Sequence, residues 1–157
     1  MKATPPSNTM QERPTLHLGT AQDIPALERI VRDSFENPWS TRLLLGAVRN
    51  HQYDVHVIRG TAQDAVAVTI THTVLDNSNL DMLAVAAAER GQGLGRHLTE
   101  CWIERSRERE LAWLTLQVNT RNNEARRLYE SLGFYTARLL GEYYPNGDAA
   151  FDMRLRI

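Results

Sequence analysis

A glycine-rich segment follows an apolar run and precedes a helical pattern; it reads Arg90-Gly91-Gln92-Gly93-Leu94-Gly95-Arg96. Free backbone N–H groups and the helix dipole bind phosphate at such a strand-to-helix junction, and glycines let the backbone approach a pyrophosphate closely. The flanking arginines add positive charge. A Rossmann fingerprint would need glycine where Arg96 stands, and no Gly-Lys-Ser/Thr of a Walker A loop follows. A tight turn without a ligand explains the same glycines, so both interpretations stay open.

A second segment with possible chemical roles runs from Asn119 to Phe134. Asn122 is placed to cap a helix, and Gly133 supplies a left-handed stop. The apolar face of this predicted helix carries Ala125, Leu128, Tyr129 and Leu132. A tyrosine on that face either packs into the core or directs its hydroxyl at a reaction.

Together the two segments resemble the GNAT superfamily of acetyl-CoA-dependent N-acetyltransferases. The family pattern Arg/Gln-x-x-Gly-x-Gly/Ala matches Arg90 to Gly95. The pattern Asn-x-x-Ala-x-x-Leu-Tyr-x-x-x-Gly-Phe matches residues from Asn122 to Phe134. The resemblance implies an α/β (α+β) GNAT fold, with a mixed, mostly antiparallel sheet of six to seven strands flanked by about four helices.

A narrower resemblance, over about Thr15 to Leu155, is to RimI-type enzymes, which acetylate the N-terminal alanine of a small-subunit ribosomal protein. The segments that carry it are Asn37-Pro38-Trp39-Ser40, Leu80–Val85 with the glycine-rich loop, and Glu142-Tyr143-Tyr144-Pro145. It implies acetyl-CoA as co-substrate, without a metal, and a protein N-terminus as partner. It also implies a monomeric cytoplasmic protein that contacts neither nucleic acid nor membrane.

Residue roles follow from this resemblance. The pantetheine arm of acetyl-CoA is expected along Leu83, Ala84 and Val85, the pyrophosphate at Gly91–Arg96, and a further cofactor contact at Asn122. Tyr129 matches the family tyrosine that protonates the departing CoA thiolate, and a neutralised thiolate leaves more easily. The acceptor is expected between the Glu36–Ser40 junction and the Glu142–Asp148 loop, with candidate contacts at Glu36, Pro38, Trp39, Glu142, Tyr143 and Tyr144.

The chain departs from the RimI-type pattern at the position of the catalytic base. RimI-type enzymes carry a glutamate in the fifth strand, and Gln117 stands at the matching position. Glutamine cannot take a proton at neutral pH. Deprotonation at pH 7 costs about 1.4 kcal/mol for an α-amine of pKa about 8, but about 4.6 kcal/mol for a lysine. Gln117 therefore favours N-terminal acetylation over lysine acetylation, and also permits a slow enzyme.

Asp81 is the candidate substitute base, because Asn79, Asp81 and Leu83 should alternate onto one face of their strand. An exposed strand-end carboxylate is the competing interpretation, and Glu142 or a water are further candidates. Two alternatives to N-terminal acetylation remain: a GNAT enzyme for a small-molecule amine or lysine, and a non-catalytic acyl-CoA-binding module.

Composition limits the function classes. The 157 residues are 42% apolar and carry a formal net charge of −1, from 18 Lys+Arg and 19 Asp+Glu. That balance argues against a general nucleic-acid binder, which needs a basic excess. No uncharged apolar run approaches the roughly 18 residues that span a bilayer. Residues 1–13 predict a disordered tail, and residues 14–157 a single acetyltransferase domain.

Alternation and turn residues predict the order β-α-α-β-β-β-α-β-α-β-β. One helix should run from about Ile24 to Phe35 and another from Ser40 to about Val48. Turns are expected at Asp76–Asn79 and at Pro145–Asp148. The expected strands are Thr15–Gly19, Tyr53–Arg59, Ala65–Val74, Leu80–Val85, Trp113–Val118, Phe134–Tyr144 and Ala149–Ile157.

Overall fold

A computed structural model describes residues 12–157. Most of the tail predicted over residues 1–13 therefore lies outside the described residues. The α-helices are α1 (Ile24–Ser34), α2 (Thr41–Arg49), α3 (Leu94–Glu108) and α4 (Asn123–Ser131). The strands are β1 (Leu16–Leu18), β2 (Tyr53–Arg59), β3 (Ala65–Val74), β4 (Asn77–Val85), β5 (Trp113–Asn119), β6 (Tyr135–Leu140) and β7 (Ala150–Arg156). Two short 3₁₀ turns, Ala21–Asp23 and Ala87–Glu89, complete the elements.

The seven strands form one sheet in the order β1-β2-β3-β4-β5-β7-β6. Its neighbouring strands are antiparallel except β4 and β5, which are parallel. With four α-helices in the described residues, this confirms the predicted mixed, mostly antiparallel sheet.

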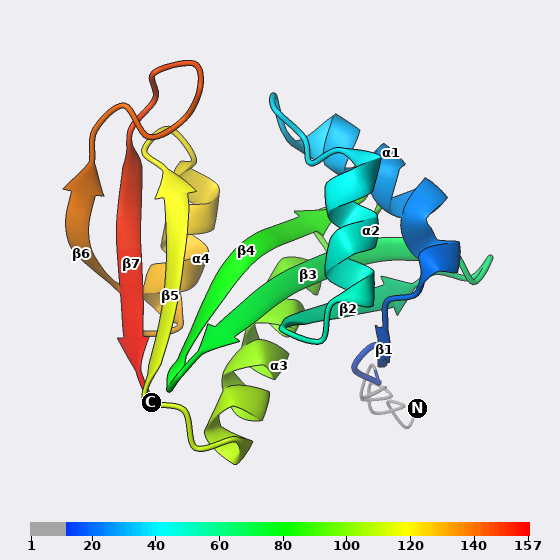
Figure 1. The fold of residues 1–157 in the computed structure, drawn as a ribbon, viewed down its shortest axis with the longest axis horizontal. Coiled ribbons are helices and arrows are strands. Elements are labelled where there is room, and N and C mark those ends of the chain that lie inside the picture. The colour runs from blue at the N-terminus through cyan, green and yellow to red at the C-terminus, as the bar shows by residue number, and fades with distance from the viewer. Residues whose placement is uncertain (1–11) are drawn as a thin grey trace, which may run out of the picture.

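Helices cover the two faces of the sheet differently (Figure 1). Helices α1 and α2 pack on β2, β3 and β4, where Leu27, Leu44 and Ile70 are fully buried. The opposite face is covered by α3 and α4, whose Trp102 and Tyr129 share a core with β5 and β7. The α1/α2 face of β5, β7 and β6 therefore has no helix over it within the described chain.

Strands β4 and β5 pair over only four residues, from Asn77 opposite Trp113 to Leu80 opposite Leu116. Beyond that point they diverge, and Figure 1 shows the two strands spreading apart toward the end where β4 meets the glycine-rich loop. The rest of β4, through Val85, pairs with β3 alone. This leaves backbone groups on one edge of β4 free for a ligand.

An extra residue in β4 changes which side chains face which side. Ile70 pairs with Met82 and Thr71 with Leu80, so Asp81 is the unpaired residue of a β-bulge. Before the bulge Leu80 packs with Trp102 on the α3 side, whereas after it Met82 joins the α1/α2 core. The prediction that Leu83 shares a face with Asn79 and Asp81 is therefore wrong: Leu83 packs against α3.

The predicted turn at Asp76–Asn79 is also wrong. The turn is Leu75–Asp76, with Leu75 in the left-handed conformation (φ 56°), and β4 already begins at Asn77. The Asp76 carbonyl accepts the backbone N–H groups of Ala112 and Trp113, which starts the β4–β5 pairing at this point. Tertiary pairing has here overridden the turn preference of a polar Asp-Asn-Ser-Asn run.

The last hairpin is shorter than predicted. Strand β6 ends at Leu140 and β7 begins at Ala150, so Tyr143 and Tyr144 lie in a loop rather than in the predicted strand Phe134–Tyr144. Both tyrosines donate their backbone N–H groups to the Asp148 carbonyl, at 2.9 and 3.0 Å. Glu142 (φ 48°) and Gly147 (φ 89°) supply the left-handed residues that close this loop.

Candidate active site

A cavity of about 580 Å³ lies on the α1/α2 face of the sheet, where that face is free of helices. Its walls come from the β3–β4 hairpin, β5, β6 and the loop after β6. The lining residues are His72, Val74, Asn77, Asn79, Asp81, Thr115, Gln117, Arg138, Leu140 and Tyr143. The polar members of this set other than Tyr143 form one hydrogen-bonded network, which is completed by Asp152 beneath them.

Gln117 lies at the centre of that network. Its side-chain amide donates to Asp152 Oδ1 at 2.9 Å and lies 3.4 Å from Asn79 Oδ1. Thr115 donates to the same Asn79 oxygen at 2.8 Å. Gln117 is thus held as a hydrogen-bond donor and presents no proton acceptor in place of a carboxylate.

Asp152 is buried beneath the cavity, with only 2% of its surface exposed. Burial alone raises the pKa of this carboxyl, but hydrogen bonds from Gln117, Arg138 and Arg154 outweigh burial and hold the pKa below its usual range. The Arg138 Nε and Arg154 Nη2 contacts are 3.1 and 3.2 Å long. A carboxylate so fully engaged is a poor proton acceptor.

His72 and Asp81 form a close pair at the other end of the network. Their Nδ1 and Oδ2 atoms are 2.5 Å apart, and the second carboxylate oxygen of Asp81 accepts from Asn79 Nδ2 at 2.9 Å. The Asp81 side chain is only 15% exposed. The competing interpretation of Asp81 as an exposed strand-end carboxylate is therefore wrong.

Two tyrosines with raised pKa values lie near one another on the α4 side of the site. Burial is the main cause for both hydroxyls and raises each pKa to about 12. The Tyr129 ring is 6% exposed and meets Phe134 edge-on, with 5.9 Å between ring centroids. Tyr144 contacts Tyr143 in the same manner at 5.0 Å. Both hydroxyls therefore stay protonated at neutral pH.

The glycine-rich loop has the shape of an anion cradle. Gly91 and Gly93 adopt left-handed conformations (φ 79° and 78°), and open space surrounds the position of a Cβ at each. Gly93 precedes α3 and provides no side-chain cap, so the first N–H groups of α3 lack an intrahelical partner. Asn122, by contrast, caps α4 with its side chain, because its Oδ1 accepts from the Ala125 N–H at 3.1 Å.

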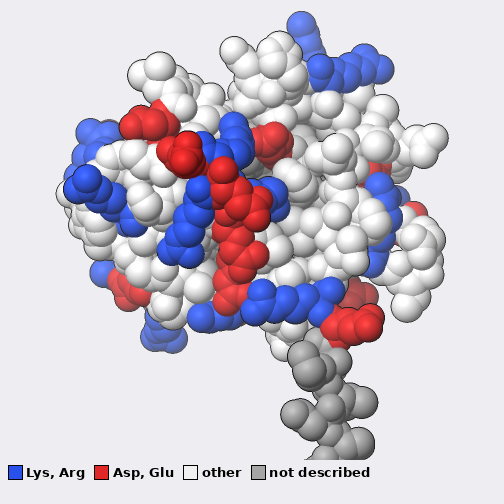
Figure 2. Space-filling view, turned by 90° about the horizontal axis from the view of Figure 1, so that it is seen from below, with Lys and Arg blue, Asp and Glu red and all other residues white. Residues whose placement is uncertain are grey.

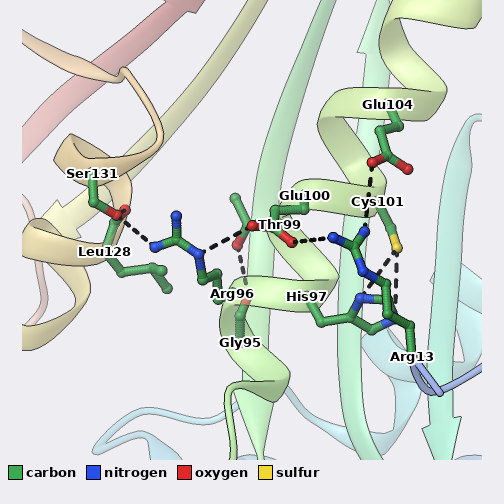
Figure 3. A network of polar contacts seen from close by, with 10 residues as sticks. All are labelled: Arg13, Gly95, Arg96, His97, Thr99, Glu100, Cys101, Glu104, Leu128 and Ser131. Atoms are coloured by element: carbon green, nitrogen blue, oxygen red, sulfur yellow. Dashed lines mark hydrogen bonds and ion pairs between the residues drawn. The ribbon is translucent and has the colours of Figure 1, made fainter. Parts of the chain in front are cut away.

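The two arginines that flank the loop are engaged with protein groups. Arg90 donates to the Val85 carbonyl at 3.1 Å and to Ser34 Oγ at 3.2 Å. Figure 3 shows Arg96 between Glu100 on its own helix and Ser131 of α4. The backbone N–H groups at the start of α3 are further donors of this loop.

The same close-up shows Arg13, from the predicted tail, beside Glu100 and Glu104 at 4.0 and 3.9 Å (Figure 3). His97 Nε2 lies 2.7 Å from the Pro14 carbonyl. Acidic and basic side chains are interspersed across this underside of the molecule (Figure 2). This face therefore presents no field of a single sign to a polyanion.

The two segments expected to hold the acceptor come together in space. Asn146 of the Glu142–Asp148 loop donates to Glu36 Oε2 at 2.9 Å, across 110 positions of sequence. Glu36 and Glu142 are exposed, Pro38 is exposed, and Trp39 packs against the α1/α2 core. Of the six candidate acceptor contacts, Tyr143 alone also lines the cavity described above.

Several residues of the network carry no signal in the sequence. Asn79 is recognisable there only as a strand position, and His72, Thr115, Arg138 and Asp152 belong to none of the motifs. Their meeting depends on register, which pairs Asn79 with His72 and Gln117 with Asp152. Among residues 12–157 no cluster of three potential metal ligands is present, and no helix is long and apolar enough to cross a membrane.

A mixed sheet that opens between two parallel strands, beside a glycine-rich loop at a helix start, defines the class of acetyl-CoA-dependent N-acetyltransferases. The chain belongs to the GNAT acetyltransferase family, because residues 37–157 match the family described as "Acetyltransferase (GNAT) domain". It is an acetyl-CoA-dependent N-acetyltransferase of the RimI-like group.

The relatives include the [ribosomal protein bS18]-alanine N-acetyltransferase of Escherichia coli K12, which is 35% identical over 130 residues, 83% of this chain and 86% of that protein. The protein of the same name from Salmonella typhimurium is 33% identical over 139 residues, covering 88% and 92%. The crystal structure of the E. coli enzyme matches with a TM-score of 0.84 at 34% identity, over 91% and 93% of the chains. Arabidopsis thaliana NAA60, at 19% identity and a TM-score of 0.84, shares the fold over 91% and 97%.

Proposed function

We propose that this enzyme acetylates a protein N-terminal amine, with the N-terminal alanine of a small-subunit ribosomal protein as its acceptor. The observation that carries the proposal is the 35% identity, over most of both chains, to an enzyme named for alanine acetylation of ribosomal protein bS18. The cavity on the open face of the sheet supports it, because an extended peptide end can reach that face without displacing a helix.

Acetyl-CoA is proposed to bind where β4 leaves β5. The backbone of Leu83, Ala84 and Val85 lies on the stretch of β4 that has no β5 partner. The pyrophosphate would lie against the free N–H groups of Gly91–Arg96, and Asn122 Nδ2 is left to donate because the cap uses only its oxygen. The shape of the loop and the absent side-chain cap of α3 support this assignment.

Tyr129 is proposed as the general acid. Its burial and raised pKa keep the phenol protonated until negative charge forms on the sulfur. Tyr144 has a similarly raised pKa but belongs to the loop expected to contact the acceptor. The acceptor amine attacks the thioester directly, since Cys101, the chain's single cysteine, is half-buried and burial raises its pKa.

An α-amine suits a site with Gln117 in the fifth strand. Its deprotonation at pH 7 costs about 1.4 kcal/mol, against about 4.6 kcal/mol for a lysine side chain. Rate can then come largely from alignment of two bound substrates. A modest proton acceptor is enough for an α-amine, and the sequence left Asp81, Glu142 and water as candidates for it.

The test measures CoA release from acetyl-CoA with three peptides. One has a free N-terminal alanine, the second has a blocked N-terminus with an internal lysine, and the third has both amines blocked. Turnover of the first alone is the expected result. Turnover of the second, or of small amines alone, would overturn the acceptor assignment. Silence on every acceptor, with acetyl-CoA still bound, would indicate a binding module instead.

A further inference from the structure

The titratable groups that line the cavity are few. Within the described chain they are His72, Asp81, Arg138 and Tyr143. An arginine is always protonated and a tyrosine hydroxyl has a pKa far above 7, so neither accepts a proton at neutral pH. Glu142, the other candidate from the sequence, is exposed and does not line the cavity. The proton acceptor of this face is therefore to be found in the His72–Asp81 pair.

The geometry distinguishes the two members of the pair. Both carboxylate oxygens of Asp81 are engaged, one with His72 Nδ1 at 2.5 Å and the other with Asn79 Nδ2 at 2.9 Å. An Asp81 carboxylate that accepts from Nδ1 places the ring proton on Nδ1. The lone pair is then left on Nε2. His72 Nε2 has no hydrogen-bond partner among the described residues, and the ring is 35% exposed.

We propose that His72 is the catalytic base of the acetyl transfer and that Asp81 is the residue that positions it. The assignment rests on the proposed function, because it presumes an amine acceptor on this face of the sheet. Asp81 fixes the tautomer and the ring orientation, and Tyr53, whose ring centroid lies 5.7 Å away, supports the imidazole from β2. The His72–Asp81 pair accepts the amine proton that Gln117 cannot accept.

The proton balance is complete without another reagent. His72 Nε2 takes one proton from the acceptor ammonium, directly or through one water. The amine then forms the C–N bond to the thioester carbon, and the C–S bond breaks with its electron pair on sulfur. Sulfur takes the Tyr129 hydroxyl proton, and the second amine proton returns to that tyrosine through solvent. His72 releases its proton, so each amide formed liberates one proton.

Two ionisable side chains contact the imidazole: Asp81 on β4 by a hydrogen bond, and Tyr53 on β2 through its ring. Arg138 on β6 and Tyr143 on the loop after β6 line the same cavity. Among the described residues, the Asp81 carboxylate alone is in hydrogen-bond contact with the ring.

The test compares kcat/KM across pH 6 to 10 for the wild-type enzyme and for His72→Gln, using the best acceptor of the peptide panel. Deprotonation of the α-amine at pH 7 costs about 1.4 kcal/mol, which corresponds to about tenfold in rate. The variant should lose up to about tenfold in kcat/KM at pH 7 and recover above pH 9, where the amine is neutral without help. His51→Gln is the matched control, because His51 is exposed in the turn before β2.

The positioning role of Asp81 is tested separately, by its effect on kcat and KM. Asp81→Asn should lower kcat about as much as His72→Gln with little change in KM, because an amide no longer fixes the proton on Nδ1. Asp81→Glu should recover part of kcat. In His72→Ala, added imidazole should restore turnover, which also covers the case in which His72→Gln folds poorly.

The outcomes separate the two proposals. Three results would overturn the role of the His72–Asp81 pair: an unchanged pH profile of kcat/KM in His72→Gln, an equal loss of kcat/KM at every pH, or no rescue of His72→Ala by imidazole. In each case, turnover by the wild-type enzyme would leave the proposed function standing. If the wild-type enzyme turned over none of the acceptors, both the proposed function and the role of the His72–Asp81 pair would be overturned.

Discussion

The Gln117 side-chain amide donates a 2.9 Å hydrogen bond to the buried carboxylate of Asp152 on the adjacent strand β7. The contact gives Gln117 a structural role at the position where a RimI-type enzyme carries its base. It also links β5 to the two arginines that neutralise Asp152. The fifth strand thus places at Gln117 a donor that holds the network together.

Gln117→Glu should destabilise the protein at neutral pH instead of restoring a base. The new carboxylate would face Asp152 and lose the hydrogen bond, at a cost of about 2 kcal/mol. Repulsion raises the pKa of the new carboxyl above that of the unfolded chain, so the deficit is largest at neutral pH and shrinks as pH falls from about 6 to about 4. Denaturant unfolding at pH 7 and pH 5 measures it.

A swap supplies the control for this substitution. In Gln117→Glu with Asp152→Asn, the asparagine amide can donate to the new carboxylate, and stability at pH 7 should return to within about 1 kcal/mol of wild type. Equal stability of the single variant and the wild type would contradict the role given to the Gln117–Asp152 contact.

Tyr129→Phe should separate chemistry from binding. The phenyl ring keeps the edge-on contact with Phe134, so stability should hardly change. Loss of the acid should lower kcat by about 10² to 10⁴-fold, with the dissociation constant of acetyl-CoA within about twofold. Tyr135→Phe, on the exposed edge strand β6, should keep wild-type kcat. Full activity of Tyr129→Phe would remove Tyr129 from the mechanism.

The glycine-rich loop can be tested by a side chain placed in its open space. At Gly93 a Cβ meets no protein atom within 4 Å, so Gly93→Val would project into the volume assigned to pyrophosphate. Calorimetry should show acetyl-CoA binding weakened by at least tenfold. Gly147→Val carries the same left-handed strain (φ 89°) in open space on another loop. An equal loss of acetyl-CoA affinity in both variants would show strain, and not contact, as the cause.

His56 makes stability depend on pH. Burial, and then the positive charge of Arg105, lower the pKa of His56 to about 4 against the opposing effect of Asp54. The unfolded chain binds this proton near pH 6.5, so the folded state loses stability as pH falls from about 6.5 to 4. Because His56 is partly exposed, solvent screening reduces the effect on stability to about 1 to 2 kcal/mol.

The check compares His56→Leu with the wild type in urea unfolding at pH 7 and pH 4.5. The leucine variant should lose about 1 to 2 kcal/mol less over that interval. His51→Gln, in an exposed turn, should follow the wild-type slope. Parallel slopes for His56→Leu and the wild type would rule out a neutral buried imidazole.

The sequence predicts two strands with their observed bounds. Tyr53–Arg59 is predicted from its alternation, and Ala65–Val74 from its content of Val, Ile and Thr, which favour strands. Ser40 and Asn122 cap their helices as predicted, accepting from Leu43 and Ala125 at 3.2 and 3.1 Å. These are local signals, readable within a few residues.

The site is harder to predict because it depends on register. The bulge at Asp81 breaks the alternation that placed Leu83 beside Asn79, and no residue type marks it in advance. The partners of His72 and Gln117 likewise follow from which residues lie opposite each other across β3–β4 and β5–β7. The family motifs mark the glycine-rich loop and Tyr129, but they cannot supply these cross-strand contacts.

The bulge at Asp81 divides β4 into two halves that contact different parts of the molecule. Ahead of it, Asn77 and Asn79 line the cavity, and behind it Leu83 supports the helix that carries the glycine-rich loop. Substitutions at the first two positions can therefore change the lining of the cavity without disturbing the packing of Leu83 against the helix. Anyone who transplants this cavity onto a related sheet must transplant the extra residue with it, since a strand one residue shorter would point its polar side chains into the core.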